Sequence, residues 1–384
     1  MPTVHPLPPL PQVAVRIARV DAFVLRCPIE TPVRTSFGTM RDRPAVFVRV
    51  EDDAGAVGWG ETWCNFPACG AEHRAQLIAT VVAPLLVGQR FASPAAAFEQ
   101  LSRATAVLAI QSGEHGPLAQ SIAGVDLALW DLCARRRGEP LWWLLGGTSD
   151  RIAVYASGIN PDEPAAVVAA KRAAGFRAFK LKVGFDVARD LANVTALRRL
   201  LGPDAALMVD ANQGWSLEQA LDRVRALAPF GLGWIEEPLR ADRPDSEWAA
   251  VAAASPAPLA GGENLSAADA FDDAIAARRF DVIQPDIAKW GGISGCWPVI
   301  ERVRAAGLRY CPHYLGAGIG LAASAHLLAA VGGDGMLEVD ANPNPLRSAL
   351  CPSLEAVDDG RTSLGSGPGL GIDVDLDRLR ALCA

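Results

Sequence analysis

Charged side chains recur at a near-constant interval in the second half of the chain, each at or near the end of a short apolar run. In chain order they are Lys182, Asp210, Glu236, Glu263, Asp286, His313 and Glu338. Successive members stand 23 to 28 residues apart, the interval expected when each repeat of strand and helix contributes one residue. Active sites of parallel barrels form at the carboxyl ends of the strands, so the spacing predicts that these side chains meet there.

Three successive members are acids: Asp210, Glu236 and Glu263 end the runs LMVD, WIE and AGGE. Neighbouring buried carboxylates repel one another and take up protons unless a cation lies between them. Mg²⁺ prefers oxygen ligands, whereas Zn²⁺ more often takes histidine or cysteine, and neither type is in this set. The pattern predicts a magnesium site; the alternative is that each acid pairs with a lysine or arginine.

The run FKLKVG at 179–184 places Lys180 and Lys182 one residue apart, between apolar residues. This alternation predicts a strand, on which the two ammonium groups point to the same face about 7 Å apart. Like charges at that distance repel, and burial increases the cost, so the pair needs a functional or structural reason.

One of the five histidines, His313, ends a predicted strand, whereas His326 lies in the helical run LAASAHLLAA and is expected in the core or on the surface. Asp286 ends the preceding strand, and a carboxylate beside an imidazole fixes its tautomer and raises its basicity. Glu338 ends the last strand. If burial keeps it protonated it could donate a hydrogen bond to a substrate oxygen; the alternative is a salt bridge across the barrel mouth.

The elements that would position these residues begin near residue 150, where short apolar strands alternate with helical stretches from RIAVYAS to GMLEV. Eight strands with seven helical segments between them predict a closed parallel barrel. An open doubly wound sheet is the alternative, but no glycine-rich phosphate-binding loop follows the first strand.

The first part of the chain has a different pattern. Residues 15 to 60 predict β-structure, with DDAG and GWGE as turns and TPVRTSFGTMRDR as a long exposed loop. Residues 71 to 137 predict helices, so this unit is α+β. The proline-rich residues 1–14 predict a loose tail.

Composition excludes several classes of protein. The net charge of −7 argues against a general nucleic-acid binder, and no apolar run reaches the ~18 residues that span a bilayer. The eight cysteines form no CxxC pair, which argues against a zinc site or a disulfide framework and favours scattered thiols. The N-terminus lacks the pattern of a secretory leader, so we expect a soluble, cytoplasmic protein.

Six motifs together resemble the enolase superfamily and, within it, the mandelate racemase subgroup. They are KLK at 180–182, VDAN at 209–212, WIEEP at 234–238, GGEN at 261–264, QPDIAKWGG at 284–292 and CPH at 311–313. The resemblance runs from about residue 20 to 376. It implies an α/β chain with a (β/α)₇β barrel of TIM type at 149–344, and an N-terminal α+β capping domain at 15–148 to which residues from about 345 to 384 return.

The resemblance also implies roles for the recurring residues. Asp210, Glu236 and Glu263 would hold Mg²⁺, and Lys182 would be a base on one face of the substrate, with Lys180 beside it. A lysine acts as a base only when neutral, and we expect the neighbouring ammonium and the dication to lower the pKa of Lys182.

On the other face of the substrate, His313 with Asp286 would be the acid/base. Glu338 would hydrogen-bond the substrate carboxylate and Asn212 would line the pocket. Lys289, in the AKWGG run, would be structural, because related cycloisomerases place their lysine base where this chain has Asp286.

The implied chemistry is abstraction of the proton α to a carboxylate, which gives an enediolate that Mg²⁺ stabilises. Dehydration of a hydroxy (sugar) acid to a 2-keto acid is the leading expectation, and racemisation or epimerisation by the same Lys/His pair is the alternative. A Schiff-base aldolase would use the lysines but leave the acids unexplained. A metal-binding barrel without catalysis would leave the lysine pair unexplained.

The predicted capping loop would select the substrate. Arg34 and Ser36 are polar enough to bind hydroxyl groups or a distal carboxylate. The expected partner is a small carboxylate, with neither nucleic acid nor membrane, and we expect a homo-oligomer.

Overall fold

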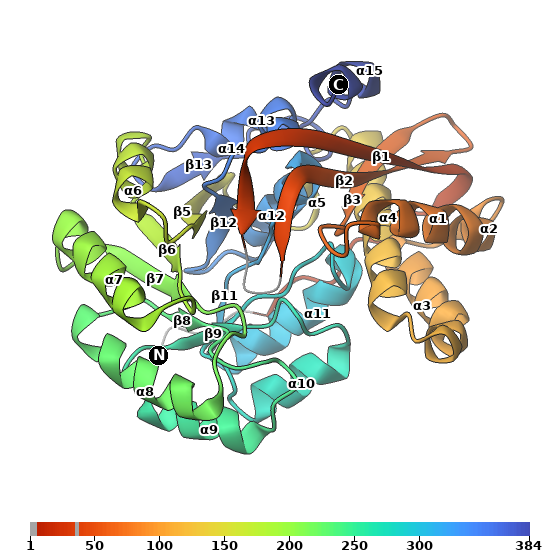
Figure 1. The fold of residues 1–384 in the computed structure, drawn as a ribbon. Coiled ribbons are helices and arrows are strands. Elements are labelled where there is room, and N and C mark those ends of the chain that lie inside the picture. The colour runs from red at the N-terminus through yellow and green to blue at the C-terminus, as the bar shows by residue number, and fades with distance from the viewer. Residues whose placement is uncertain (1–5, 35–37) are drawn as a thin grey trace.

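Two β-sheets organise the computed structural model, which describes residues 6–34 and 38–384 (Figure 1). The smaller sheet has the order β3-β2-β1-β4 and is antiparallel. Its strands are β1 (Val15–Arg34), β2 (Thr39–Asp52), β3 (Val57–Thr62) and β4 (Arg90–Phe91). The helices that follow or flank these strands are α1 (Gly70–Leu77), the π-helix η1 (Ile78–Val82), α2 (Ala83–Leu86), α3 (Pro94–Ser112), α4 (His115–Arg137) and α5 (Leu141–Leu144). This is the predicted α+β capping unit.

The larger sheet is a nearly closed parallel barrel, as predicted. Its strands are β5 (Arg151–Ile159), β6 (Ala178–Lys182), β7 (Ala206–Asp210), β8 (Ile235–Glu236), β9 (Leu259–Gly261), β10 (Val282–Ile283), β11 (Arg309–Tyr310) and β12 (Met336–Asp340). Each strand from β5 to β11 pairs in parallel with the next, and β12 pairs with β5. The alternative of an open doubly wound sheet is therefore excluded.

Helical segments separate all successive barrel strands and surround the barrel in Figure 1. They are α6 (Pro164–Ala173), α7 (Val187–Leu201), α8 (Leu217–Leu227) with the 3₁₀ turn η2 (Ala228–Phe230), α9 (Asp245–Ala254), α10 (Ala268–Ala276), α11 (Gly292–Ala305) and α12 (Gly318–Val331). After the barrel come α13 (Pro345–Leu350), α14 (Pro352–Glu355), β13 (Arg361–Ser363) and α15 (Leu376–Leu382).

We call the seven recurring charged residues, Lys182 to Glu338, the ladder. An apolar layer fills the barrel beneath them. It comprises Tyr155, Ala178, Met208, Trp234, Ala260, Val282 and Cys311, all buried. Tyr155 and Trp234 meet edge to face with ring centroids 5.3 Å apart. Inward-pointing side chains stack in layers in such barrels, so this layer closes the interior and leaves the polar side chains above it at the mouth.

The GWGE motif forms part of strand β3, so the prediction that it is a turn was wrong. Its glycines allow α4 to lie against the strand: a Cβ on Gly60 would stand 2.0 Å from the carbonyl oxygen of Gly124. The tertiary contact with α4, which no local pattern reveals, overrides the turn propensity of glycine. Glu61, the last residue of the motif, is buried.

The predicted exposed loop at 31–43 is also largely strand, since β1 continues to Arg34 and β2 begins at Thr39. Arg43 is buried, and its guanidinium donates to Asp340 Oδ2 (2.5 Å) at the end of β12 and to the Pro343 carbonyl. This ion pair explains why Arg43 is covered, whereas Thr39 and Arg41 are exposed. The hairpin of β1 and β2 reaches across the barrel in Figure 1. Ser36 lies outside the described residues, and of Arg34 only the backbone, paired with Thr39, is described.

Both ends of the described chain pack on the rest of the molecule. Residues 6–14 contain no helix or strand, but Trp297 Nε1 donates to the Pro8 carbonyl (3.1 Å) and Leu7 and Leu10 pack against the core, so this part of the tail is held rather than loose. At the other end, β13 pairs with β5 while α15 contacts β1. The domain boundaries stay a prediction.

A disulfide joins Cys27 in β1 to Cys383 just after α15, which corrects the expectation of free thiols throughout. The two residues are 356 positions apart, and only the fold brings them together. No helix within 6–34 and 38–384 has the length and apolar character needed to cross a membrane.

Candidate active site

The strand register places the first three ladder residues side by side. Lys182 on β6 is directly opposite Asp210 on β7, and Asp210 is opposite Glu236 on β8. Glu263 follows the end of β9, and Asp286 and His313 follow β10 and β11. Glu338 lies within β12, which pairs with β5. Six of the seven stand at or just beyond the carboxyl ends of successive strands, and Glu338 stands two residues before the end of β12, so the structure brings the predicted residues together.

Lys180 lies deeper than Lys182. It is completely buried, whereas 13% of the Lys182 side chain is exposed. The Lys180 ammonium contacts Glu236, lies 2.8 Å from Glu338 Oε1, and is 5.5 Å from the centroid of the Tyr155 ring. Burial lowers the pKa of Lys180, but these carboxylates outweigh it and raise the pKa well above its usual value. Lys180 is thus an internal counter-ion without access to a substrate.

The Lys182 ammonium faces the barrel mouth and donates to Asp210 Oδ2 (2.5 Å) and Asn212 Oδ1 (2.7 Å). Burial and the charge of Lys180 lower the pKa of Lys182, but carboxylates, Asp210 foremost, outweigh them and raise it. The lowering by Lys180 is as predicted, while the lowering expected from the dication stays a prediction. The contact with Asn212 places that residue at the mouth, where the sequence located it.

The predicted His–Asp pair is present. His313 Nδ1 and Asp286 Oδ2 are 2.8 Å apart, and His313 Nε2 is 3.0 Å from Glu263 Oε2. Burial lowers the pKa of His313, yet the carboxylates of Glu263 and Glu338 and the bond to Asp286 raise it well above its usual value. Asp286 itself accepts the backbone N–H of Ala288, which fixes the carboxylate that orients the imidazole.

Glu338 forms the salt bridge that the sequence left as an alternative. One of its oxygens accepts from Lys180 and from the Ser157 hydroxyl (2.5 Å), and the other accepts the backbone N–H of Tyr314 (3.0 Å). Burial raises the pKa of Glu338, but Lys180 and His313 outweigh it and lower the pKa. Of the two alternatives that the sequence left open, the geometry therefore favours the salt bridge over a protonated carboxyl.

Two further residues, which the sequence analysis missed, hold Glu236. Trp234 Nε1 (3.0 Å) and Gln284 Nε2 (2.8 Å) both donate to Glu236 Oε2. Trp234 stands two residues before Glu236, and Gln284 two before Asp286, so the period of a strand could have marked both as facing the same way.

A second group surrounds Glu263, of which the sequence analysis named only Lys289. Lys289 donates to Glu263 Oε1 (2.9 Å) and lies 5.0 Å from the centroid of the Trp63 ring, a residue of the capping domain. This agrees with a structural role for Lys289. Glu237, adjacent to Glu236, is buried and accepts from Asn264 Nδ2 (2.7 Å). Burial and the charges of Glu263 and Asp210 raise the pKa of Glu237 well above its usual value.

The donor chemistry of Asp210, Glu236 and Glu263 fits a hard divalent cation. All three are buried oxygen donors at neighbouring strand ends, and the pKa of Glu236 is raised to about 7 by burial and then by the other carboxylates, against the charge of Lys180. A cation among them would relieve this repulsion. Among the described residues, no three acidic, histidine or cysteine side chains already converge as metal ligands. Each of the three acids is instead turned to a cationic partner.

Comparisons with known families agree with this geometry. Residues 19–146 match the family model described as the mandelate racemase / muconate lactonizing enzyme N-terminal domain, and residues 164–378 match the enolase C-terminal domain-like model. The chain belongs to the enolase superfamily. Within it, the chain falls in the mandelate racemase/muconate lactonizing enzyme subgroup, as the motifs predicted, and it is an enzyme of that superfamily.

Curated relatives catalyse different reactions. The chain is 34% identical to D-galactarolactone cycloisomerase from Agrobacterium fabrum, over 95% of this chain and 98% of the relative. It is 28% identical to arabinonate dehydratase from Saccharolobus solfataricus, over 86% of this chain and 88% of the relative. Superfamily membership is therefore firm, whereas the individual reaction differs among relatives of this similarity.

Solved structures give the same picture. A mandelate racemase/muconate lactonizing enzyme from Bordetella bronchiseptica is 61% identical with a TM-score of 0.92, covering 97% of this chain and 100% of that chain. A racemase from Streptomyces coelicolor with bound magnesium is 33% identical with a TM-score of 0.85 (96% and 100% covered). An enolase from Bradyrhizobium complexed with magnesium and mandelic acid is 32% identical with a TM-score of 0.82 (96% and 98% covered). Structural relatives thus bind magnesium and a small carboxylate.

Proposed function

We propose that this enzyme abstracts the proton α to a carboxylate with the help of Mg²⁺ and then expels a β-hydroxyl group, converting a hydroxy (sugar) acid to a 2-keto acid. One observation carries the proposal. Asp210, Glu236 and Glu263 form an acidic row. Lys182 contacts Asp210 at one end of this row, and His313 contacts Glu263 at the other end. A substrate carboxylate beside this row would have one acid/base group on each side.

The ligands of the metal would be Asp210, Glu236 and Glu263, and the bound cation would supply positive charge beside the enediolate oxygens. Lys182 takes the α-proton in its neutral form. The electron pair of the broken C–H bond passes into the enediolate, and its return forms the Cα=Cβ bond of the enol as the β C–O bond breaks. His313, held by Asp286, gives its proton to the departing hydroxyl, which leaves as water, and the enol tautomerises to the 2-keto acid.

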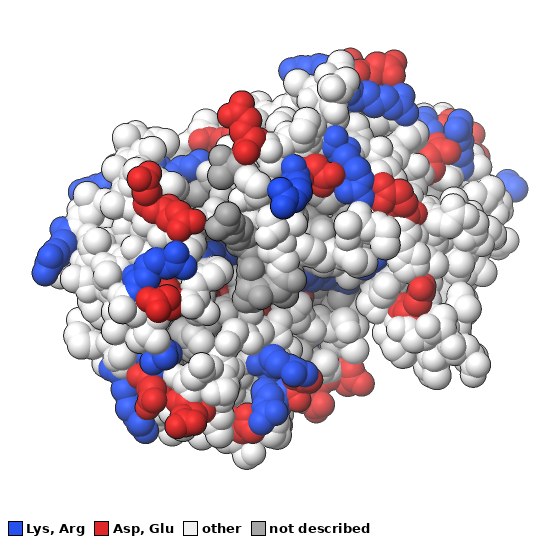
Figure 2. All heavy atoms as spheres, in the orientation of Figure 1, with Lys and Arg blue, Asp and Glu red and all other residues white. Residues whose placement is uncertain are grey.

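A cavity of about 370 Å³ has both polar and apolar lining residues. It lies where the ends of β5 and β12 meet the capping hairpin, and Asn160, Asn342, Arg189, Phe185 and Pro32 are among its lining residues. Amide and guanidinium groups hydrogen-bond hydroxyl groups and carboxylates. Figure 2 shows acidic and basic side chains mixed over this side of the molecule, in line with a small ligand rather than nucleic acid as partner.

Racemisation or epimerisation is the second candidate, because the same two groups would allow a proton to leave from one side and return from the other. One of the structural relatives is described as a racemase, which supports racemisation or epimerisation as an alternative reaction. The two reactions differ in whether the β C–O bond breaks.

A screen of acid sugars with Mg²⁺ in D₂O, followed by NMR, tests both. Dehydration gives a 2-keto product, whereas deuterium at the α-carbon without keto product supports epimerisation. We expect Lys182→Ala to abolish exchange and Lys171→Ala, a lysine on α6, to retain it. Exchange at the wild-type rate after removal of both Lys182 and His313 would overturn the assignment.

The same preparations separate this proposal from a Schiff-base aldolase. EDTA should abolish the activity proposed here, whereas a Schiff-base enzyme keeps its activity. Covalent trapping of a keto substrate by borohydride on wild type and Lys171→Ala, but not on Lys182→Ala, would favour the aldolase.

A further inference from the structure

Glu61 is a buried carboxylate of the capping domain that the proposed chemistry does not use. It ends the GWGE motif in β3 and is 2% exposed. Its two oxygens accept the backbone N–H groups of Ala317 (2.6 Å) and Gly320 (2.9 Å), at the start of α12. The first N–H groups of a helix lack partners within the helix, and an anionic acceptor binds them strongly.

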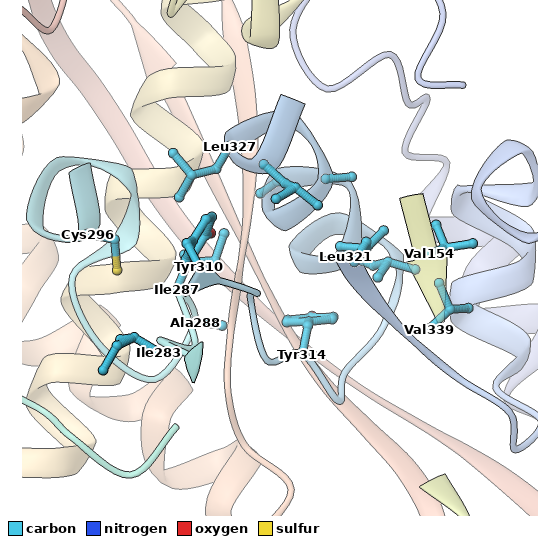
Figure 3. Close-up of a cluster of buried hydrophobic side chains, with 14 of the residues drawn as sticks. Val154, Ile283, Ile287, Ala288, Cys296, Tyr310, Tyr314, Leu321, Leu327 and Val339 are labelled. Carbon is cyan, nitrogen blue, oxygen red and sulfur yellow. The ribbon is translucent and has the colours of Figure 1, made fainter. Parts of the chain in front are cut away.

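The segment that Glu61 holds leads directly from His313 into α12. Tyr314 lies between them, and its hydroxyl is beside the Glu61 carboxylate, whose charge, after burial, raises the pKa of the phenol. A Cβ on Gly316 would stand 2.3 Å from the Tyr314 hydroxyl oxygen and 2.8 Å from Glu61 Oε1, so the turn is packed tightly around both. Figure 3 shows the Tyr314 ring among buried apolar side chains that include Leu321. The residue after His313 is therefore fixed by its ring, and its backbone N–H is fixed by Glu338.

Residues next to Glu61 hold the same loop and its neighbour. Asn65 Nδ2 donates to the Leu315 carbonyl (2.5 Å), and the backbone N–H of Trp63 donates to the Ala288 carbonyl (3.2 Å). Ala288 is two residues after Asp286 and donates its own N–H to that carboxylate. Residues 61–65 thus contact the segments that carry both members of the His–Asp pair.

We propose that Glu61 is a positioning residue for His313, through the turn 314–320, and that the capping domain in this way orients the acid/base group of the barrel. The proposal rests on the proposed function only for the catalytic role of His313. The hydrogen bonds described for Lys182, on β6, go to Asp210 and Asn212 and not to this turn. A defect at Glu61 should therefore affect the reaction steps that need His313 more than those that need Lys182.

The test is Glu61→Gln, in which one oxygen of the carboxylate becomes an NH₂ group. An amide presents a donor to one of the two backbone N–H groups, so the turn must rearrange. Asp131→Asn is the control: Asp131 is buried and accepts the backbone N–H groups of Trp59 (2.8 Å) and Leu370 (2.7 Å), neither of which belongs to the turn 314–320, and it also accepts from Arg135 Nε (2.8 Å).

The first measurement needs no substrate. In protein labelled with ¹⁵N in the imidazole rings, the five histidines give few signals, and His313→Asn identifies those of His313. We expect Glu61→Gln to shift or broaden the His313 ring signals and Asp131→Asn to leave them in place. His313 signals that coincide with wild type in folded Glu61→Gln would overturn the proposal. If Glu61→Gln does not fold, Tyr314→Phe decides in the same way, since it removes the hydroxyl beside Glu61.

The second measurement uses any carboxylic acid that the wild type deuterates at the α-carbon. We expect the steps that require His313 to slow by about 10- to 100-fold in Glu61→Gln, the range expected for a small displacement of a catalytic group. Exchange that requires Lys182 should stay close to wild type, and an equal loss in both would contradict selective positioning. If the wild type exchanges no acid that is tried, the proposed function fails while the ring signals still decide the role of Glu61.

Discussion

Replacing Lys180 with methionine tests whether this lysine is the internal counter-ion of the site. Its ammonium is completely buried, contacts Glu236, and lies 2.8 Å from Glu338 and 3.8 Å from Asp210. Methionine fills a similar volume without charge, so the variant leaves buried carboxylates without their cation. Removal of one partner of a buried ion pair costs about 3–5 kcal/mol, and we expect the free energy of unfolding to fall by that amount.

The loss should depend on pH. Lys180 lowers the pKa of both Glu236 and Glu338, against burial. Without it, the pKa of Glu236 in the folded state, already about 7, rises further, and we expect that of Glu338 to rise above its value in the unfolded chain. A carboxyl group with a raised folded-state pKa contributes stability at low pH and loses it as the pH increases. The deficit of Lys180→Met should therefore be larger at pH 8 than at pH 5.

Urea unfolding followed by tryptophan fluorescence, in EDTA at both pH values, measures this. Lys171→Met is the control, because Lys171 on α6 lies 5.7 Å from the centroid of the Phe176 ring and outside the acidic row. Adding Glu338→Gln to Lys180→Met should restore part of the stability, since it removes one stranded charge. A loss below about 1 kcal/mol, or one that is equal at the two pH values, would refute the counter-ion role.

Mg²⁺ should raise the melting temperature of the wild type but not of Asp210→Asn, because the ligand set of this variant lacks one carboxylate. Calorimetry with Mg²⁺ or EDTA measures both melting temperatures. An equal rise in the two proteins would contradict the assigned ligands. Burial lowers the pKa of His326 to about 4, so the unfolded chain takes up a proton before the folded one does. Stability should fall by about 3 kcal/mol as the pH drops from about 6.5 toward 4, and urea titrations should find this dependence missing in His326→Gln. Cys27→Ser should lower the free energy of unfolding by about 2–4 kcal/mol by freeing the unfolded chain. A reductant should reproduce that loss in the wild type and change nothing in the variant.

The barrel and the ladder could be predicted because their signal is local and repeats. From the second strand of the barrel to the eighth, a charged residue stands at or near the end of each apolar run, and the same interval brings the next strand alongside. The contact of His313 with Asp286 follows from this regularity. His326 was placed in the core or on the surface, and it is buried with Nδ1 accepting the backbone N–H of Trp142.

What the sequence missed depends on contacts between distant segments. Lys180 has the same strand pattern as Lys182, and only the return of β12 beside β5 brings Glu338 to it. Arg43 reads as exposed until Asp340 covers it. For the pKa of Lys182, the sequence reading named Lys180, which lowers it, but did not weigh the nearby carboxylates, Asp210 foremost, which raise it.

The Cys27–Cys383 bond has a topological consequence. It joins two positions 356 residues apart and so closes a covalent ring that contains the whole barrel. A single cut by a protease anywhere between the two cysteines opens the ring but releases no fragment. The nicked molecule stays one covalent species until a reductant is added, and the barrel strands stay tethered from both sides of the cut. Formation of the disulfide thus gives a molecule in which a surface loop between the two cysteines can be cleaved without release of a fragment.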